Sequence, residues 1–497
     1  MATETEIKLS LTPRAAIALA THPRLADTPP LRQRLLNTYY DTPALRLQRE
    51  RVAVRYRKKG SEWLLTVKCA ARSVGGLARR SEWEMPGVPG EFDFSHVDDA
   101  KLRHRLESWR AELTPAFTTH FTRMAWIIQP QTGVRIELAL DRGWIAAQGR
   151  RQPICEIELE LLDGEPDALF ALASELQSAL GDRYSLHPEA ASKAERGYRL
   201  FANVPQQAIR ARKIPLERGM TGVAAFQAIA LACVGHLQDN EHGVRESDAP
   251  EFVHQARVAI RRLRSAIRSW KPLLPESFVD SFDARWQSLA AALGETRNWD
   301  VFLTETLPPL ASSFPQHADI DHLLRHARKR RERCRKEALV ALKSVAYSRL
   351  LLEFTAAVLA LSDREKPVRI RTFARRCLDK HARRAAQLAE CATGLDAASR
   401  HRLRVVLKRL RYALEFFEPL FPGQRQEQYY AEATRLQDLL GRLNDLVFAR
   451  QIAVETLADR EMGLVAGWIG GRNELLLGKF EEALTAFLEL RKPWKKR

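Results

Sequence analysis

The sequence predicts an α+β protein of two domains, with antiparallel strands in the first and only helices in the second. Residues 1–200 contain short segments in which polar and apolar residues alternate, which is typical of strands. From Gly219 onward, apolar residues recur at helical spacing. The intervening stretch contains Pro205 and Pro215. We therefore expect a first domain over 1–202, a linker over 203–217 and a helical domain over 218–497.

The first domain has alternating segments separated by Gly and Pro clusters, and helical stretches between some of them. We expect strands over Thr3–Leu9, Arg51–Arg57, Trp63–Lys68, Arg80–Glu84, Val134–Asp141 and Ile154–Leu161. We expect helices over Pro13–Ala20, Ala100–Glu112, Asp167–Leu180 and Ala190–Phe201.

Charge is distributed unevenly between the two domains. Residues 1–205 hold 29 basic and 26 acidic residues, whereas the remainder holds 50 and 35, so most of the net charge of +18 lies in the helical part. Such an excess attracts polyanions. There is no long apolar run and no secretion-signal pattern, and six scattered cysteines form no CxxC pair. These features predict a cytoplasmic protein with reduced thiols, without a membrane span, a disulfide frame or a zinc site.

Several predicted strands place charges on one face. Alternate side chains of a strand point the same way, so the two carboxylates and the ammonium of Glu4-Thr-Glu6-Ile-Lys8 share a face. Similar sets of charged or polar residues are Arg51/Arg55/Arg57, Thr66/Lys68, Arg80/Glu82/Glu84, Arg135/Glu137/Asp141 and Glu156/Glu158/Glu160. One interpretation is a solvated face, and the other is a closed sheet with a charged interior around a charged ligand. The presence of both signs on several strands favours the second.

The order of these motifs resembles the CYTH family, the triphosphate tunnel metalloenzymes. Glu4-x-Glu6-x-Lys8 is similar to the family's ExExK signature, and Asn37-Thr-Tyr39-Tyr40-Asp41-Thr42 resembles its YYDT segment. Further basic and acidic motifs follow in the family's order, up to Ser192-Lys193. The resemblance covers about residues 1–202 and implies an eight-stranded antiparallel tunnel with flanking helices.

The resemblance also implies roles for individual residues. Metal ligands for Mg²⁺ or Mn²⁺ would be Glu4, Glu6, Asp141, Glu156 and Glu158, with Glu160 as a further candidate. Triphosphate oxygens would be bound by Lys8, Arg55, Arg57, Lys68, Arg123 and Lys193, with Arg80 and Arg51 as additional candidates. Glu82 and Glu84 would position basic residues or a second metal. The catalytic group would comprise Lys8, Glu4 and Glu6.

The implied activity is a metal-dependent inorganic triphosphatase, a hydrolase that converts tripolyphosphate to pyrophosphate and phosphate. Charge neutralisation and positioning would lower the barrier, and either Lys8 or a metal-bound water would move the proton. Alternatives on the same tunnel are a nucleoside or thiamine triphosphatase and an adenylyl cyclase. A further alternative is a non-catalytic polyphosphate-binding protein.

The helical domain contains an internal repeat. Residues 254–264 align without gaps onto 401–411, which brings two basic stripes into correspondence. The stripes are His254, Arg257, Arg261 and Arg264, and His401, Arg404, Lys408 and Arg411. Like charges at helical spacing repel, and no acid lies between His254 and Lys271 to relieve the first stripe. A solvated helix face is the plainer interpretation, but an anionic ligand explains the repetition better.

This duplicated pattern resembles the CHAD family, helical domains with conserved histidines that often follow CYTH domains. The resemblance covers about 218–497 and implies an all-α bundle of two pseudo-repeats that binds polyphosphate through the eight stripe residues. We expect inorganic triphosphate and polyphosphate as partners, in the cytoplasm or at polyphosphate granules, and no protein partner. Aromatic residues are scarce along the stripes, with Tyr412 beside the second, which argues against nucleic acid.

Overall fold

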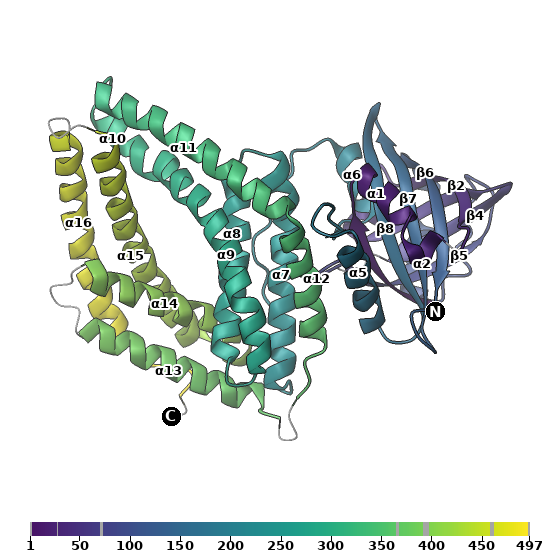
Figure 1. Ribbon diagram of the computed structural model, residues 1–497. Coiled ribbons are helices and arrows are strands. Elements are labelled where there is room, and N and C mark those ends of the chain that lie inside the picture. The colour runs from purple at the N-terminus through teal and green to yellow at the C-terminus, as the bar shows by residue number, and fades with distance from the viewer. Residues whose placement is uncertain are drawn as a thin grey trace. The chain divides into compact units, whose positions relative to one another are not determined.

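A computed structural model describes residues 2–26, 28–69, 73–363, 367–390, 397–457 and 462–495. The chain forms two compact units. Unit 1 comprises 1–207 and 343–360, and unit 2 comprises 208–342 and 361–497. Figure 1 shows the strands in unit 1 and the long helices of unit 2. No described helix has the length and apolar character needed to cross a membrane.

The strands of unit 1 form one closed antiparallel sheet. The order is β5-β4-β3-β2-β6-β7-β8-β1, and β1 pairs with both β8 and β5, which closes the tunnel. A short β9 pairs with the end of β1. The strands are β1 (Ala2–Ser10), β2 (Leu31–Asp41), β3 (Val52–Lys59), β4 (Glu62–Cys69), β5 (Leu77–Pro86), β6 (Thr114–Ile128), β7 (Arg135–Ala147), β8 (Arg150–Asp163) and β9 (His187–Pro188). The predicted eight-stranded tunnel is confirmed.

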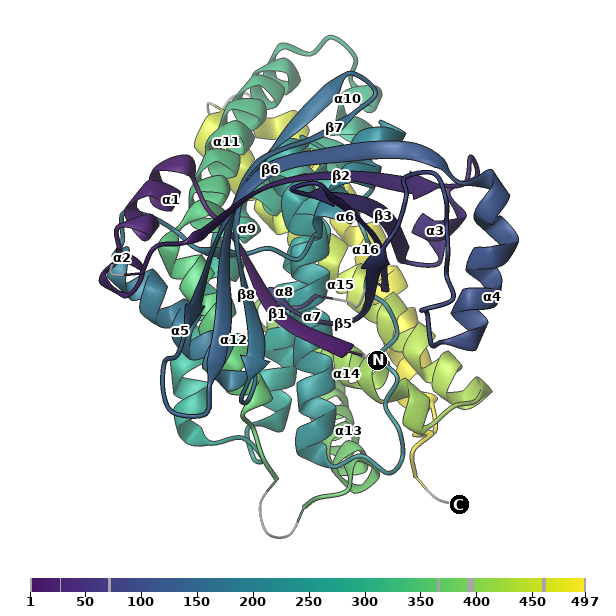
Figure 2. The same ribbon diagram turned by 90° about the vertical axis from the view of Figure 1, so that its right-hand side faces the viewer.

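Most apolar side chains of the strands point outward and are covered by helices. Ile7 and Leu9 of β1 are fully buried in a core shared with α1 and α5. Across the tunnel, Leu65 and Val67 of β4 pack in a second core with α4, and Figure 2 shows α4 on the opposite side of the sheet from α1. The helices are α1 (Pro13–Ala20), α2 (Pro23–Ala26), α3 (Arg46–Arg49), α4 (Ala100–Trp109) and α5 (Asp167–Ala179). Because apolar residues occupy the outside, the alternating charged residues face the interior.

Helix α6 (Lys193–Ala202) packs against one end of the tunnel. Ser192 caps its N-terminus, and Glu195 returns the bond to the Ser192 backbone N–H, which completes a capping box. Gly197 lies against the ring of Phe117, where a Cβ atom would come within 2.0 Å of Cε2. The lack of a side chain at this position therefore lets α6 approach β6 closely, and the cap fixes where Lys193 begins the helix.

One helix from the second half of the sequence belongs to unit 1. Helix α12 (Val345–Leu359) contributes Leu352 to the core of α1 and α5. Its Ser348 hydroxyl lies 2.6 Å from the Ser185 hydroxyl and 3.0 Å from Nδ1 of His187. This helix lies in the stretch that was predicted to belong to the helical domain. No motif in its sequence predicted its packing in unit 1.

Unit 2 is built from helices, as predicted, and shows the duplication. Helices α8 and α14 each have 21 residues, and His254 and His401 occupy the same position in them. Outside unit 1's α12, the helices after residue 217 are α7 (Gly222–Glu246), α8 (Pro250–Trp270), α9 (Glu276–Val301), α10 (Leu307–Ser313), α11 (Ala318–Lys343), α13 (Ile370–Glu390), α14 (Ala397–Phe417), α15 (Gln424–Thr456) and α16 (Met462–Glu489). A π-helical segment, Phe302–Thr306, joins α9 to α10. Residues 203–217 contain neither helix nor strand.

The six predicted strands and four predicted helices of unit 1 are confirmed to within a few residues. Three further strands, β2, β6 and the short β9, were not predicted from alternation. Arg51 was expected to share a strand face with Arg55 and Arg57, and this was wrong. It precedes β3, is exposed and has a left-handed backbone with φ of 56°.

Candidate active site

The interior of the tunnel contains a cavity of about 380 Å³. Eight cations and seven carboxylates line it, so both signs are present in nearly equal number. The cations are Lys8, Arg55, Arg57, Lys59, Lys68, Arg80, Arg123 and Lys193. The carboxylates are Glu4, Glu6, Glu82, Glu84, Glu137, Glu158 and Glu160. Eight basic residues were proposed to bind triphosphate. The structure brings seven of them together around this cavity, and Arg51 is the one that does not line it.

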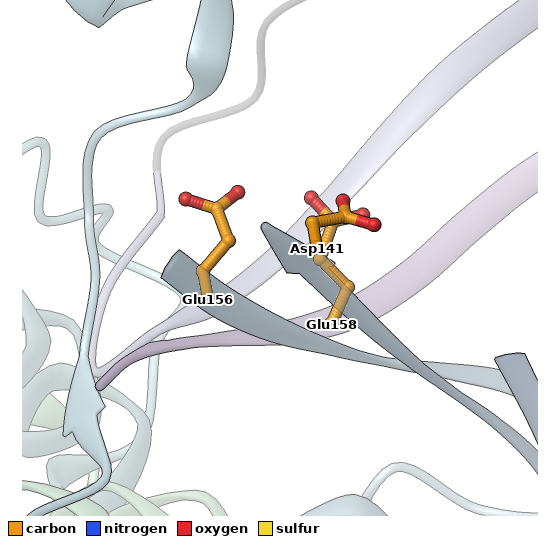
Figure 3. Close-up of side chains that lie close together, drawn as sticks. All are labelled: Asp141, Glu156 and Glu158. Carbon is orange, nitrogen blue, oxygen red and sulfur yellow. The ribbon is translucent and has the colours of Figure 1, made fainter. Parts of the chain in front are cut away.

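Two of the predicted metal ligands lie behind the cavity wall. Asp141 and Glu156 are fully buried, and neither lines the cavity, whereas Glu4, Glu6 and Glu158 do. One carboxylate oxygen each from Asp141, Glu156 and Glu158 lies within 4.8 Å of the others, and Figure 3 shows them on neighbouring strands β7 and β8.

Four cations surround this carboxylate trio. Lys193 Nζ lies 2.7 Å from Asp141, 2.5 Å from Glu156 and 2.9 Å from Glu158. Arg123 binds Asp141 through two nitrogens, at 2.8 and 2.7 Å, and reaches Glu158 at 2.5 Å. Lys8 pairs with Glu158 at 3.0 Å, and Arg196 pairs with Glu156. The trio is therefore neutralised by the protein itself, and its partners are held in fixed positions.

These pairs keep the charged forms of their members stable. Burial by itself would raise the pKa of Glu156, but Lys193, Arg196 and Lys8 lower it to about 2. Burial opposes the charged form of Lys8 as well, but Glu158 and Glu156 outweigh it, and its pKa lies above the ordinary value. The raised pKa favours the ammonium form of Lys8 at neutral pH.

On the opposite wall, formed by β3, β4 and β5, neutral acceptors and more distant acids hold Arg55 and Arg57, whereas Lys68 and Arg80 pair closely with carboxylates. Arg55 donates to the Tyr39 hydroxyl at 3.1 Å, and Arg57 donates to Asn37 Oδ1 at 3.0 Å. Their distances to Glu82 and Glu84 are 3.7 and 3.8 Å. Lys68 pairs with Glu82 at 2.5 Å and with Glu4 at 3.1 Å, and Arg80 pairs with Glu6. Nε and one terminal nitrogen of Arg55, and Nε of Arg80, have no hydrogen-bond acceptor among the described residues.

Glu160 differs from the other interior carboxylates. Among the described residues, it has no Lys or Arg partner within ion-pair distance. Its strand neighbours across the sheet are Glu6 on β1 and Glu137 on β7, which places three carboxylates in one row. Burial, followed by the charges of Glu4 and Glu137, raises the pKa of Glu160 to about 7. Arg80 pairs with Glu6 and Arg123 lies 4.0 Å from Glu137, so Glu160 is the member of this row without a Lys or Arg partner among the described residues. An interior carboxylate without a counter-cation is suited to a hard divalent ion.

The structure adds residues to which the sequence analysis gave no role. Arg196 is one of them, although the motif around Ser192 and Lys193 was recognised, and its position one helical turn after the cap could have suggested it. Tyr39 is another: it holds Arg55 and lies in the recognised YYDT segment. Glu160, a minor candidate at first, becomes a main one because of its unpaired environment.

A second cavity, of about 360 Å³, lies in unit 2 beside the basic stripes. Its lining includes six cations and no carboxylate: Arg257, Arg261, Arg264, Arg268, Lys408 and Arg409. Four predicted stripe residues are among them, and they come from both repeats, since α8 and α14 pack together. The other four do not line it: His254, His401, Arg404 and Arg411.

The charges around this second cavity repel one another. Burial, with Arg261, Arg404 and Arg257, lowers the pKa of Lys408 to about 6. Burial and the same kind of repulsion lower the pKa of Arg257 to about 10. Arg411 points elsewhere, to Gln437 and Tyr430, and His401 is exposed. Two cavities of the chain thus collect basic residues, with acids in one and without acids in the other.

The closed sheet with a charged interior, followed by a duplicated helical region, defines a protein with a β-tunnel domain and an all-helical domain. Residues 2–198 match the CYTH domain family, and residues 228–454 match the CHAD domain family. The chain therefore carries a CYTH domain followed by a CHAD domain. The inorganic triphosphatase of Haemophilus influenzae is 35% identical over 208 residues, which are 40% of this chain. The chain spans about half of that relative, since the match covers 55% of its length.

Solved structures also resemble parts of the chain. The CHAD domain of Ricinus communis is 29% identical and covers 58% of this chain and 98% of its own, with a TM-score of 0.48. A protein from Hippeastrum, described as having a dominant triphosphatase activity, is 20% identical and covers 41% and 98%, with a TM-score of 0.32. Both TM-scores are below 0.5, so we draw no conclusion from these two structures.

Proposed function

We propose that unit 1 hydrolyses inorganic triphosphate to pyrophosphate and orthophosphate with the help of a divalent cation. The observation that carries this proposal is the cavity inside the tunnel, with cations and carboxylates in nearly equal number. Triphosphate alone would require only the cations. Carboxylates that lack a partner, such as Glu160, have a purpose when a metal ion accompanies the phosphate. The name of the Haemophilus relative supports the same choice of substrate.

The phosphate oxygens would be bound by cations that approach from opposite walls. Arg55 and Arg57 come from β3, Arg123 from β6 and Lys193 from the start of α6. Guanidinium groups suit this role because their planar N–H pairs bind phosphate oxygens bidentately. Hydrogen bonds to Tyr39 and Asn37 fix the arginine side chains before substrate arrives. Preorganised charge of this kind stabilises the extra negative charge of the transition state.

A Mg²⁺ or Mn²⁺ ion would be held where the carboxylates face the cavity, by Glu4, Glu6, Glu158 and Glu160. Asp141 and Glu156 were predicted as ligands too. Like Glu158 they pair with Lys193, but unlike Glu158 they do not line the cavity, which favours a supporting role for both. The cavity-facing carboxylates would hold such an ion, which would supply charge neutralisation for the phosphate and lower the pKa of a coordinated water.

In the proposed reaction, a water oxygen adds to a terminal phosphorus while the bridging P–O bond breaks. Pyrophosphate leaves, and the proton of the water passes to solvent or to a cavity carboxylate. Lys8, with its raised pKa, remains protonated and stabilises negative charge near Glu158. Glu4 and Glu6 act with Lys8 from the same face of β1, and no covalent intermediate with the protein is formed.

The test is orthophosphate release from tripolyphosphate by the full chain, with and without Mg²⁺. Glu158→Gln removes a carboxylate that contacts Lys8, Arg123 and Lys193, and we expect kcat/KM to fall about 100-fold or more. Glu165→Gln, an exposed residue just beyond β8, is the control and should retain full activity. A loss of less than about threefold for Glu158→Gln would remove the assignment of the site.

The same assay separates the alternatives on this tunnel. ATP and thiamine triphosphate should be poorer substrates than tripolyphosphate, and no cyclic nucleotide should form from ATP. A preference for ATP with a cyclic product would instead indicate an adenylyl cyclase.

We further propose that the cavity in unit 2 binds inorganic polyphosphate. Six cations without a lining carboxylate, and the depressed pKa of Lys408, indicate a missing anion. Arg261→Ala should weaken polyphosphate binding about tenfold, whereas Arg333→Ala, an exposed residue paired with Glu337, should not. Competition with single-stranded DNA at fixed salt distinguishes the ligands: displacement of polyphosphate by DNA at equal phosphate concentration would contradict the proposal.

A further inference from the structure

One strip of the tunnel's outer surface carries exposed basic residues, whereas the rest is apolar and covered by helices. Elsewhere the outward residues of the strands are apolar and covered by helices, as for Leu138 and Leu140 of β7. Further along the same strand, the outward residues Arg142 and Trp144 are exposed. On β2 and β6 the corresponding outward positions hold Arg34 and His120. This part of the sheet therefore presents a basic surface where the rest of the barrel wall has its hydrophobic core.

A groove of about 940 Å³ lies on this strip. Five cations line it, and Glu62 is its single carboxylate. The cations are Arg32, Arg34, Lys58, Lys59 and Arg142, and all are exposed. Within the described part of the chain, none of the five forms an ion pair. Five unpaired cations gathered at one groove raise the local positive potential and favour an extended anion.

The groove adjoins the catalytic cavity. Gln33, Leu35, Lys59 and Phe121 line both of them. The β2–β3 pairing ends at Leu35 and Lys59, whereas β2 continues to Leu31 with only β6 as its neighbour. The wall of the tunnel is thus incomplete beside residues 31–34 of β2, and a linear ligand has a route from the interior to the outer strip.

The aromatic residues of the groove do not favour a nucleobase. The Trp144 ring is stacked on His120 of β6, with centroids 5.6 Å apart and planes at 9°. Arg151 of β8 covers it at 5.4 Å. The two partners come from the strands on either side of β7, so the ring is already occupied by protein groups. A base would have to displace one of them to stack.

We propose that this groove, which we call the outer basic groove, holds the distal phosphates of a linear polyphosphate whose terminal phosphates occupy the tunnel. The inference rests on the proposed hydrolase function and extends its substrate class from triphosphate to longer chains. Water adds to the terminal phosphorus, the adjacent bridging P–O bond breaks, and orthophosphate leaves a chain shortened by one phosphate. The groove cations contact the chain that remains and do not take part in the bond cleavage.

The experiment compares tripolyphosphate, a long-chain polyphosphate and ATP as substrates of the full chain. The double variant R34A/R142A removes two groove cations that lie outside the catalytic cavity. We expect its KM for the long chain to rise about tenfold, while kcat/KM for tripolyphosphate stays within about twofold. The control R14A/R103A removes two exposed arginines from α1 and α4 and the same net charge. It should leave all three substrates unchanged, and both variants keep the unit 2 cavity intact.

Each possible result either supports or contradicts the proposal. An equal rise in KM for tripolyphosphate and the long chain, or no rise for either, overturns the groove assignment. A rise confined to ATP shows that the groove holds a nucleoside and also overturns it. Hydrolysis of tripolyphosphate but not of the long chain by the unsubstituted protein rejects the extended substrate class while the proposed function stands. Failure to hydrolyse tripolyphosphate at all removes the proposed function, and this inference with it.

Discussion

The tunnel cavity and the unit 2 cavity collect basic side chains in opposite ways. In the tunnel, Lys193 and Arg123 each contact more than one carboxylate at hydrogen-bond distance. In unit 2, Arg257 and Lys408 face other cations, and their pKa values are lowered to about 10 and about 6. The tunnel therefore holds its geometry without a ligand, whereas the unit 2 cavity remains electrostatically unfavourable until an anion enters it.

This difference fits the two proposed tasks. Hydrolysis needs charges placed accurately before the substrate arrives, because they act on the transition state. Storage or capture of a polyanion needs only net attraction, and repulsion among the cations is relieved on binding.

The largest effect should come from breaking a pair in the tunnel. Arg196→Ala leaves the fully buried Glu156 without one of its partners, and we expect unit 1 to lose about 3 kcal/mol of stability. Native-state hydrogen exchange of the β7 and β8 amides measures this for unit 1 alone. Arg199→Ala, an exposed residue on the same helix, should cost less than about 0.5 kcal/mol. An equal loss of stability in Arg196→Ala and Arg199→Ala would contradict a stabilising role for the pair of Arg196 and Glu156.

The next effect concerns Lys408 in unit 2. Its pKa of about 6 lies below the ordinary 10.5, so the side chain is mostly neutral at pH 8 without a ligand. Polyphosphate favours the ammonium form, so binding takes up a proton, and affinity should fall as pH rises above about 6. The fall is at most about tenfold per pH unit. Lys408→Met should flatten this dependence in calorimetric titrations, whereas Lys336→Met, an exposed residue, should not. A pH slope that Lys408→Met leaves intact would exclude Lys408 as its source.

Glu160 should cause a smaller pH dependence than Lys408, and in the opposite direction, because Mg²⁺ activation should rise with pH. With a pKa raised to about 7, it holds a proton below that pH, and a divalent cation has to displace it. Mg²⁺ activation should therefore strengthen severalfold between about pH 6 and pH 8, and Glu160→Gln should abolish this trend. In the metal-free protein, Glu160 keeps its proton over a pH range in which the unfolded chain loses it, and this stabilises the folded state. That contribution to the free energy of unfolding is lost as pH rises from 4.5 through about 7. Thermal unfolding of metal-free protein should register that loss in the unsubstituted chain but not in Glu160→Gln.

The smallest effect should come from the stripe histidine of the second repeat. His401 is exposed and does not line the unit 2 cavity. His401→Ala should change the Kd for polyphosphate by less than about twofold, in contrast to Arg261→Ala. A tenfold loss at His401 would place the ligand outside the cavity, along the exposed end of α14.

The sequence was sufficient for the elements whose two faces differ clearly. β1 and β8 alternate charged and apolar residues, so their strands and inward carboxylates could be predicted from spacing alone. β2 and β6 could not, because neither face is consistently apolar. On β6, Phe117 and Phe121 point inward while His120 and Thr122 point outward. His120 and Thr122 also line the outer basic groove.

The ion pairs within the site could not be predicted from residue spacing. Asp141, Glu156 and Glu158 were all predicted as metal ligands from their residue type and the resemblance. Only the fold shows that Lys193 enters from α6 and lies among them. Similarly, the stripe spacing placed Arg261 and Lys408 on helix faces. The meeting of the two repeats in one cavity required the packing of α8 against α14.

Helix α12 has a consequence for how the protein can be divided. The chain leaves unit 1 after residue 207, returns for 343–360 and leaves again, so unit 1 is not a continuous segment of the sequence. A fragment ending near residue 205 would lack Leu352 and the Ser348 hydroxyl, and it would expose apolar side chains of the α1 and α5 core to water. Truncation at the apparent linker therefore removes part of unit 1, and a graft or fusion of the tunnel would have to carry α12 as a separate piece.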